Sequence, residues 1–184
     1  MTRVAVALVH YPCVDRHGEL YTTSITNLDV HDIARTSRTY GIAAFYVVTP
    51  ISAQQEMGRA IAAYWEEGKG RERNPSRREA MALVRIVASV EEGLAAEAAI
   101  VGSPPVVIAT SAKAGKKASL SHPEMRLRLD NMESAVVLFG TGHGLAPSLV
   151  EGADHLLEPL PGHDGYNHLS VRSAAAIIID RLLG

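Results

Sequence analysis

The sequence predicts an α/β fold in which a mainly parallel sheet carries helices on both faces. Short runs of β-branched and small apolar residues have the continuous apolar character of strands that are buried on both sides. These runs alternate with longer segments of helical pattern, as expected where helices connect neighbouring parallel strands. With 184 residues the chain is long enough for a substantial core, and we expect a single domain over residues 1–184.

The strands are predicted at the apolar runs, and the helices where capping residues flank a helical pattern. Gly41 stands where a left-handed cap ends a helix, and Ser52 and Ser89 are suitable N-caps. A long polar connection, 11–27, follows the first strand. The predicted strands are 4–9, 43–48, 84–88, 106–109, 135–139 and 155–157. The predicted helices are 29–40, about 52–67, 90–101, 122–131 and 169–183.

The last predicted helix is apolar nearly all the way round, which is unusual for the end of a chain. Such a helix has to be buried on more than one side. We therefore expect it to lie under another segment or against a second subunit. Asn167 or His168 would then stand at its N-terminus, where backbone amides are free to bind a ligand.

Composition excludes several classes of protein. Lys plus Arg (18) nearly balances Asp plus Glu (20), so partners have to be recognised by local patches rather than by net charge. Cys13 is the only cysteine, which rules out an internal disulfide and favours a buried, unreactive thiol. No apolar run is long enough for a membrane span, and the histidines lack the spacing of a structural metal site. We expect a cytoplasmic protein without a membrane segment or a metal.

Three polar loops follow predicted strands, and ligands of open α/β sheets bind at the carboxyl ends of the strands. The first loop contains Thr110 and Ser111, and the other two span 140–145 and 158–168. Glycines at 140, 142 and 144 allow positive φ and a close approach of the backbone to a ligand. Their spacing fits neither a dinucleotide fingerprint nor a P-loop. An ordinary strand-to-helix turn is the alternative for the Gly-rich segment.

Three segments together resemble the SPOUT superfamily of methyltransferases. Residues 27–41 contain an Asn, an Arg-Thr pair at 35 and 36, and a closing Gly, as in the first SpoU-type motif. Residues 139–145 are similar to the second motif, and 156–160 with 169–171 are similar to the third. The resemblance implies a C-terminal deep trefoil knot, a homodimer and S-adenosylmethionine as cofactor. The knot would account for the apolar last helix.

The resemblance also implies roles for individual residues. The implied cofactor-binding residues are Thr110, Ser111, Gly140, Thr141, Gly142, Leu157, Pro159, Leu160, Leu169 and Ser170. The implied catalytic residues are Asn27, Arg35, His143 and His168. Arg35 would orient a phosphate or assist deprotonation at a dimer interface, and the two histidines could carry the proton. A helix-surface ion pair for Arg35, and simple turn hydrogen bonds for the histidines, are the alternatives. The second motif lacks its usual Glu, and Thr141 and His143 stand there instead.

Basic residues cluster in two segments, 69–78 and 113–128. The first is interpreted as an exposed loop, interrupted by Asn74-Pro75, that leads into a short helix over 79–83. A solvated face is the ordinary explanation for such clusters, and the phosphates of RNA are the functional one. Within the resemblance we expect methyl transfer to tRNA or rRNA, at a ribose 2′-hydroxyl or a base. The alternatives are a non-catalytic RNA-binding or regulatory dimer that keeps the cofactor pocket, and an ordinary Rossmann-type nucleotide-binding enzyme. The basic residues are Lys69, Arg71, Arg73, Arg77 and Arg78 in the first cluster, and Lys113, Lys116, Lys117, Arg126 and Arg128 in the second.

Overall fold

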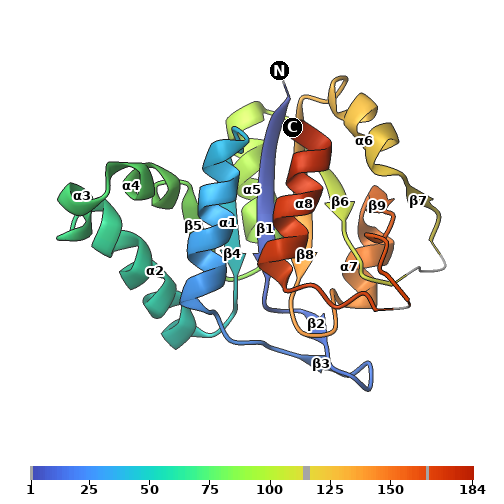
Figure 1. Ribbon diagram of the computed structural model, residues 1–184, viewed down its shortest axis with the longest axis horizontal. Coiled ribbons are helices and arrows are strands. Elements are labelled where there is room, and N and C mark those ends of the chain that lie inside the picture. The colour runs from blue at the N-terminus through green and yellow to red at the C-terminus, as the bar shows by residue number, and fades with distance from the viewer. Residues whose placement is uncertain (1, 114–116, 165) are drawn as a thin grey trace.

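A computed structural model describes residues 2–113, 117–164 and 166–184, and its centre is a seven-stranded sheet in the order β5-β4-β1-β8-β6-β9-β7 (Figure 1). Every pairing within this sheet is parallel, which confirms the predicted fold class. The first polar connection also holds a separate antiparallel hairpin, β2–β3. The strands are β1 (Arg3–Val9), β2 (Cys13–Val14), β3 (Leu20–Tyr21), β4 (Ala44–Val48), β5 (Val84–Val87), β6 (Val106–Ala109), β7 (Ser119–Leu120), β8 (Ser134–Gly140) and β9 (His155–Leu157).

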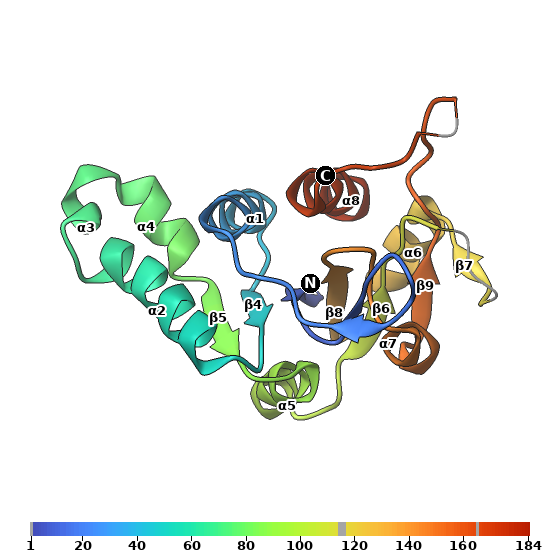
Figure 2. The ribbon, with the colours of Figure 1, turned by 90° about the horizontal axis from the view of Figure 1, so that it is seen from below.

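Helices lie on both faces of the sheet, as predicted (Figure 2). α1 and α8 cover one face, and α5 covers the other with α7 near its far end. Ser89 caps α5, and Gly102 ends it in the left-handed conformation with φ 89°. α7, which begins at Pro147, was not predicted from the sequence. The helices are α1 (Asn27–Thr39), α2 (Ser52–Glu66), α3 (Gly70–Arg73), α4 (Pro75–Met81), α5 (Val90–Val101), α6 (His122–Leu129), α7 (Pro147–Gly152) and α8 (Val171–Leu183).

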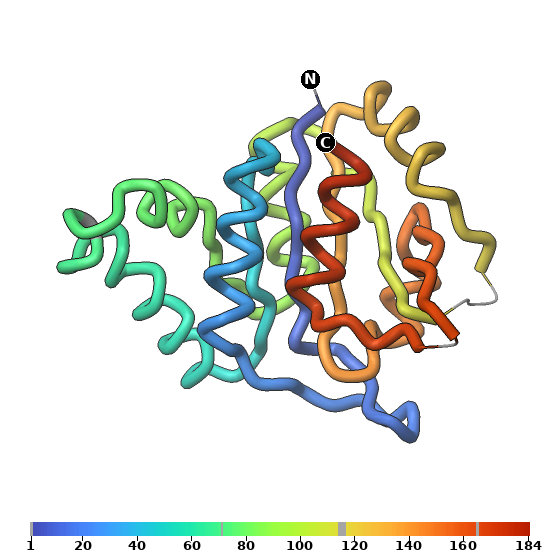
Figure 3. Tube along the Cα trace, in the orientation of Figure 1, coloured from blue at the N-terminus to red at the C-terminus, as the bar shows by residue number. Residues whose placement is uncertain are grey.

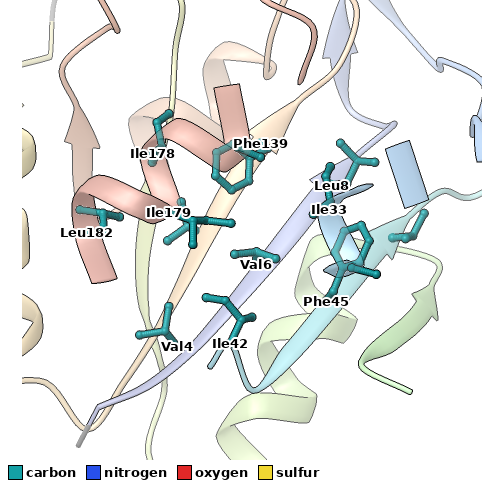
Figure 4. Packing of buried hydrophobic residues seen from close by; sticks show 14 of the residues in the cluster. Val4, Val6, Leu8, Ile33, Ile42, Phe45, Phe139, Ile178, Ile179 and Leu182 are labelled. Atoms are coloured by element: carbon teal, nitrogen blue, oxygen red, sulfur yellow. The ribbon is translucent and has the colours of Figure 1, made fainter. Parts of the chain in front are cut away.

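The central strand β1 supplies both hydrophobic cores. Its side chains alternate, so Val4, Val6 and Leu8 pack toward α1 and α8, while its alanines and Val9 pack toward α5. Figure 4 shows Ile178, Ile179 and Leu182 of α8 beside this first set of residues. Burial on both faces explains why the strand is apolar throughout rather than alternating with polar residues.

The segment interpreted as a basic loop is helical, so that prediction is wrong. α3 and α4 together cover 70–81, and with α2 they project beyond the β5 edge of the sheet (Figure 1). The Asn74 side chain accepts a hydrogen bond from the Arg77 amide, and Pro75 occupies the first turn, so the Asn-Pro pair starts a helix rather than breaking one. Ser52 is likewise inside α2, whose N-cap is Ile51 without a side-chain bond.

The last helix is buried on one side within the single chain. α8 begins at Val171 with Ser170 as its N-cap, so neither Asn167 nor His168 stands at its N-terminus. Its buried residues are Ala175, Ile178, Ile179 and Leu182, whereas Ile177 is 37% exposed. The expectation of burial on more than one side is therefore not met within one chain. The trefoil knot stays a prediction.

The two termini lie close together at one end of the sheet, and the Gly-rich turn after β8 lies at the other (Figure 3). The hairpin β2–β3 lies at the same end as that turn (Figure 1). This end holds the carboxyl ends of the strands, where the sequence predicts a ligand site. Within the described residues, no helix is long and apolar enough to cross a bilayer.

Candidate functional site

A cavity of about 640 Å³ lies at the carboxyl ends of the strands, and we call it the strand-end cavity. The loops after β6 and β8 form two of its walls, and the segment before α8 with the first turns of that helix forms another. It is lined by Thr23, Ser24, Asp29, Thr110, Ser111, Ala112, Lys113, Phe139, Gly140, Thr141, Gly142, His143, Gly144, Leu160, Asn167, His168, Leu169, Ser170, Val171, Ala174 and Ile178.

All predicted cofactor-binding residues line this cavity except Leu157 and Pro159. Leu157 is 1% exposed and belongs to the hydrophobic core. Pro159 is half-buried outside the lining. Thr110, which follows β6, and Ser170, which caps α8, are 60 positions apart in the sequence but line the same cavity.

The Gly-rich turn is held in place by its own backbone and by the hairpin. A Cβ at Gly140 would lie 2.8 Å from the carbonyl carbon of Gly144 and would also meet the Leu145 amide. Gly142 has a φ of 61°, and a Cβ there would clash with the Tyr21 hydroxyl. The close approach within the turn is by itself a reason for Gly at 140, and the ligand contact predicted for this residue stays a prediction.

A chain of polar groups beneath the turn reaches into the protein. Thr141 Oγ1 donates to the Val9 carbonyl at 2.9 Å and lies 2.5 Å from Thr23 Oγ1. The Thr23 hydroxyl in turn lies 2.7 Å from His10 Nδ1. His10 is fully buried, and burial lowers the pKa of its imidazole to about 4, with Asp29 opposing the shift. The imidazole is therefore neutral at physiological pH.

Asp29 places a carboxylate in the wall of the strand-end cavity. Its side chain is 10% exposed and pairs with Arg172 of α8 at 3.1 Å, while the Thr26 hydroxyl donates to it at 2.6 Å. From the sequence, Asp29 was interpreted as a helix residue that could pair with Arg35, and neither Thr23 nor His10 was predicted to belong to the site. The one available signal was that Thr26 and Asp29 have the spacing of a helix cap.

Backbone amides are available at two places in the lining. Within the described part of the chain, the Gly142 amide has no hydrogen-bond acceptor, whereas the Thr141 amide donates to the Cys13 thiol. The first amides of α8 have no intrahelical acceptor either, although Ser170 Oγ accepts from the Ser173 amide at 3.4 Å. Amides of this kind bind carboxylate and hydroxyl oxygens well.

The two predicted histidines stand at the cavity, and both are exposed. His143 donates its amide to the Val14 carbonyl at 3.1 Å, which fixes it beside the hairpin. The His168 ring packs edge-on against Tyr166 with 5.4 Å between ring centroids. Asn167 donates to the Ala112 carbonyl at 2.9 Å and so joins two of the walls. Within the described residues, no group of three or more His, Cys, Asp or Glu side chains could hold a metal ion.

Arg35 and Asn27 lie outside the strand-end cavity. Both line a separate hollow between α1 and α2. Asp29 and Arg35 are six residues apart on α1, which corresponds to about 9 Å along the axis and about 120° around it. Asp29 faces the cavity, so Arg35 points away from it within the same chain. The sequence motif does not show this separation, because it gives spacing but not direction.

The second basic cluster is not a uniform charged surface. Lys113 lines the cavity, whereas Lys117 donates to the carbonyls of Val150, Glu151 and Ala153 and so caps the end of α7. Lys116 lies outside the described residues.

Cys13 is fully buried, and its thiol donates to the Val9 carbonyl at 3.1 Å. Burial raises the pKa of this thiol, as expected for an unreactive cysteine.

A family model described as SAM-dependent RNA methyltransferase matches residues 3–184. The chain belongs to this family. The cofactor of this methyltransferase family is S-adenosylmethionine, so the Rossmann-type alternative is set aside. The chain belongs to the family although its second motif lacks the usual Glu.

Relatives of this methyltransferase are similar along nearly its whole length. It is 44% identical over 178 residues to a tRNA (guanine-N(1)-)-methyltransferase of Oleidesulfovibrio alaskensis. That match covers 97% of this chain but 41% of the relative, so the chain spans less than half of that protein. An uncharacterised protein of Aquifex aeolicus is 38% identical over 180 residues, which cover 97% of this chain and 87% of that protein.

Solved structures share the fold of this methyltransferase. The SpoU methyltransferase AviRb of Streptomyces viridochromogenes in complex with AdoMet has a TM-score of 0.57 at 14% identity, covering 99% of this chain and 57% of that chain. The TrmH/SpoU tRNA modifying enzyme of A. aeolicus has a TM-score of 0.56 at 18% identity, covering 99% and 73%. At these identities the likeness concerns the fold alone, and it agrees with the predicted SPOUT resemblance.

Proposed function

We propose that this chain holds S-adenosylmethionine in the strand-end cavity and transfers its methyl group to an RNA. One observation carries the proposal. Loops after β6 and β8 and the first turns of α8 converge on one cavity of about 640 Å³ in a member of a SAM-dependent RNA methyltransferase family. This volume lies within the range of pockets that enclose small molecules and cofactors.

The donors and acceptors of the lining suit this cofactor. Its amino-acid end carries a carboxylate, for which the amides that open α8 supply donors. Its sulfonium is positively charged, and Asp29 is the acidic side chain among the described lining residues. We assign the amides around Thr110, Gly140 and Leu160 to the adenosine part. Gly142 and Ser170 are assigned to the ribose or the methionine end.

Bound S-adenosylmethionine supplies an electrophilic methyl group, and the protein supplies position and proton removal. The Gly-rich turn, fixed against the hairpin, gives the cavity a rigid floor. The acceptor loses a proton during transfer, and His143 and His168 stand at the cavity with rings that can take it. Neither ring is buried, so each can exchange that proton with water. Arg35 is excluded from the same chain's cavity and would act from a second subunit.

A homodimer is therefore part of the proposal. The outward side of α8 keeps Ile177 exposed at 37%, and Leu169 before it is 48% exposed. Leu169 lines the cavity, and Ile177 lies on α8, whose first turns form one of its walls. A second subunit on this side would cover the apolar surface that the sequence assigned to burial. It would also bring its own Arg35 toward the cavity.

We propose tRNA as the substrate to test first. The name of the Oleidesulfovibrio relative specifies the N1 position of guanine in tRNA, but the chain spans 41% of that protein. The guanine specificity could thus belong to either part of the relative. A ribose 2′-hydroxyl and a base nitrogen both remain in the proposal.

The test is methyl transfer from radiolabelled S-adenosylmethionine to unfractionated tRNA, followed by mass spectrometry of the nucleosides. We expect one modified nucleoside whose mass increases by a methyl group, and its fragments assign the methyl to the ribose or the base. Cofactor binding without incorporation into tRNA or rRNA would instead support the non-catalytic regulatory dimer. Failure to bind the cofactor would contradict both.

A further inference from the structure

Three arginines gather on the side of α1 that faces away from the strand-end cavity. Arg35 and Arg38 of α1 and Arg77 of α4 line a hollow of about 490 Å³. Asn74 and Ser76 add polar groups to the same hollow, which is formed where α4 packs beside α1. Guanidinium groups and short polar side chains in a concave surface are the groups that bind phosphate oxygens.

These charges are largely available to a ligand. Arg38 pairs with Glu79 at 2.8 Å, but both side chains are more than half exposed, so this pair is weak. Arg35 and Arg77 make no ion pair with any residue that the structure describes. The Arg77 guanidinium is held over the Trp65 ring, 4.8 Å from its centroid, which orients it without neutralising it.

A second hollow, of about 650 Å³, lies next to the first and carries aromatic residues. Arg35 and Arg77 line both hollows. In the second hollow Tyr64 is 44% exposed and packs edge-on against Trp65 at 5.0 Å between centroids. Exposed aromatic rings beside arginines are a common arrangement for stacking unpaired bases next to their phosphates.

Position on α1 links these hollows to the strand-end cavity. Leu28 lines the second hollow and Asp29 lines the cavity, and these are consecutive residues in the first turn. The two surfaces therefore meet at neighbouring positions of the same helical turn. A nucleic acid strand longer than a few nucleotides can contact both at once.

We infer that the surface formed by Arg35, Arg38, Tyr64, Trp65 and Arg77 binds a single-stranded segment of the RNA substrate. The arginines take its phosphates and Tyr64 stacks on a base. This inference rests on the proposed function and deepens it, because it names how the substrate is held outside the cavity. We call these five residues the arginine–aromatic surface.

In the proposed dimer Arg35 lies near the second copy, but for the rest of this surface a second copy of the chain is a poorer occupant than RNA. A two-fold interface places the same residues against each other, so the arginines would need acidic partners from the same patch. The acidic residues in the two linings are Asp32 and Glu79, two carboxylates against three arginines, and Asp32 also pairs with Arg172. RNA supplies the missing negative charge.

The test measures binding of fluorescein-labelled unfractionated tRNA by anisotropy at several KCl concentrations. Arg38→Gln with Arg77→Gln is expected to weaken binding about tenfold or more at low salt. The slope of log affinity against log salt should fall by roughly one to two, since each lost phosphate contact of a single strand contributes about 0.7. The matched control is Arg126→Gln with Arg128→Gln, two exposed residues of α6 at the other end of the sheet, which should keep the wild-type slope.

Tyr64→Ser provides an independent readout in case the double variant folds poorly. It should weaken tRNA binding about fivefold or more while leaving the salt slope unchanged, because it removes stacking and no charge. Unchanged slope and affinity in the double variant, or equal losses in the control, would overturn the inference. So would a dimer-to-monomer shift in light scattering with tRNA binding intact. S-adenosylhomocysteine is the product that remains after S-adenosylmethionine gives up its methyl group, and all these variants should bind it like wild type. Calorimetry with this product therefore distinguishes failure of the proposed function from failure of the RNA-binding inference.

Discussion

Arg172 of α8 donates to Asp29 of α1 at 3.1 Å, and this ion pair joins the first turns of the two helices that wall the strand-end cavity. Asp29 is 10% exposed at its side chain and Arg172 is 36% exposed, so the pair is partly shielded from water. Arg172 also approaches Asp32 at 3.5 Å. The last helix is thereby tied to the first one through polar contacts as well as through the core.

Arg172→Ala is expected to lower the free energy of unfolding by about 1–3 kcal/mol, because it leaves the Asp29 carboxylate with little compensation. Urea denaturation followed by circular dichroism measures the change. Arg38→Ala is the matched control. It breaks the exposed pair with Glu79 and should cost no more than about 1 kcal/mol. Equal losses in both variants would show that the Asp29–Arg172 pair contributes no more to stability than the exposed Arg38–Glu79 pair.

Gly140→Ala is expected to destabilise the protein by about 2 kcal/mol or more. The added methyl group would lie 2.8 Å from the Gly144 carbonyl carbon, and backbone atoms cannot move aside as a flexible side chain does. Gly152→Ala is the control, since a Cβ at Gly152 has open space around it, and it should change stability by less than about 1 kcal/mol. Thermal denaturation of the two variants compares them. Unaltered stability of Gly140→Ala would contradict the geometry of the turn.

Stability should decrease as the pH falls from about 6.5 to about 4, with His10 as a main cause. Burial lowers the pKa of His10 to about 4 in the folded chain, whereas the unfolded chain has the ordinary value near 6.5. Between these values the unfolded state binds the extra proton, so its population rises with acidity. The loss attributable to His10 is about 3 kcal/mol at most, and urea denaturation at several pH values measures it.

His10→Gln removes this titration and should flatten the pH dependence of stability over that range. His163→Gln is the control, because the His163 side chain is 97% exposed, and it should retain the wild-type profile. A His10→Gln variant whose stability falls as steeply as that of wild type would rule out His10 as the source.

Arg35→Ala is expected to lower methyl transfer strongly and to leave the affinity for S-adenosylmethionine nearly unchanged. Arg35 lines the hollows beside α2 and α4 and not the strand-end cavity, so it does not contact the assigned cofactor site of its own chain. Single-turnover transfer and calorimetry measure the two quantities. Loss of both to the same extent would indicate a structural role for Arg35.

The sheet could be predicted from the sequence because its strands are buried on both faces and therefore apolar throughout, as in β1 and β8. The segment 70–81 could not, since charge and Asn74-Pro75 look like a loop when the capping bond to the Arg77 amide is unknown. Within one chain α8 is buried on one side, and its burial against a second subunit stays a prediction. Apolar composition does not tell which side of a helix a second subunit would cover.

Much of the strand-end cavity followed from the rule that ligands bind at the carboxyl ends of parallel strands. Thr110, Gly140 and Ser170 could be placed there because each closes or follows a strand or opens a helix. Asp29 and Thr23 were missed because their position depends on how the hairpin and α1 pack against the turn. Leu157 was misplaced because a residue at a strand end can face either the cavity or the core.

Calorimetric titration of wild type, Ala174→Leu and Ala176→Leu with S-adenosylmethionine shows whether the strand-end cavity holds the cofactor. Ala174 lines the strand-end cavity, whereas Ala176 is on the same helix and outside the lining. We expect one cofactor per chain for wild type, at least a tenfold loss of affinity for Ala174→Leu, and near wild-type affinity for Ala176→Leu. No binding by wild type, or undiminished binding by Ala174→Leu, would contradict this expectation.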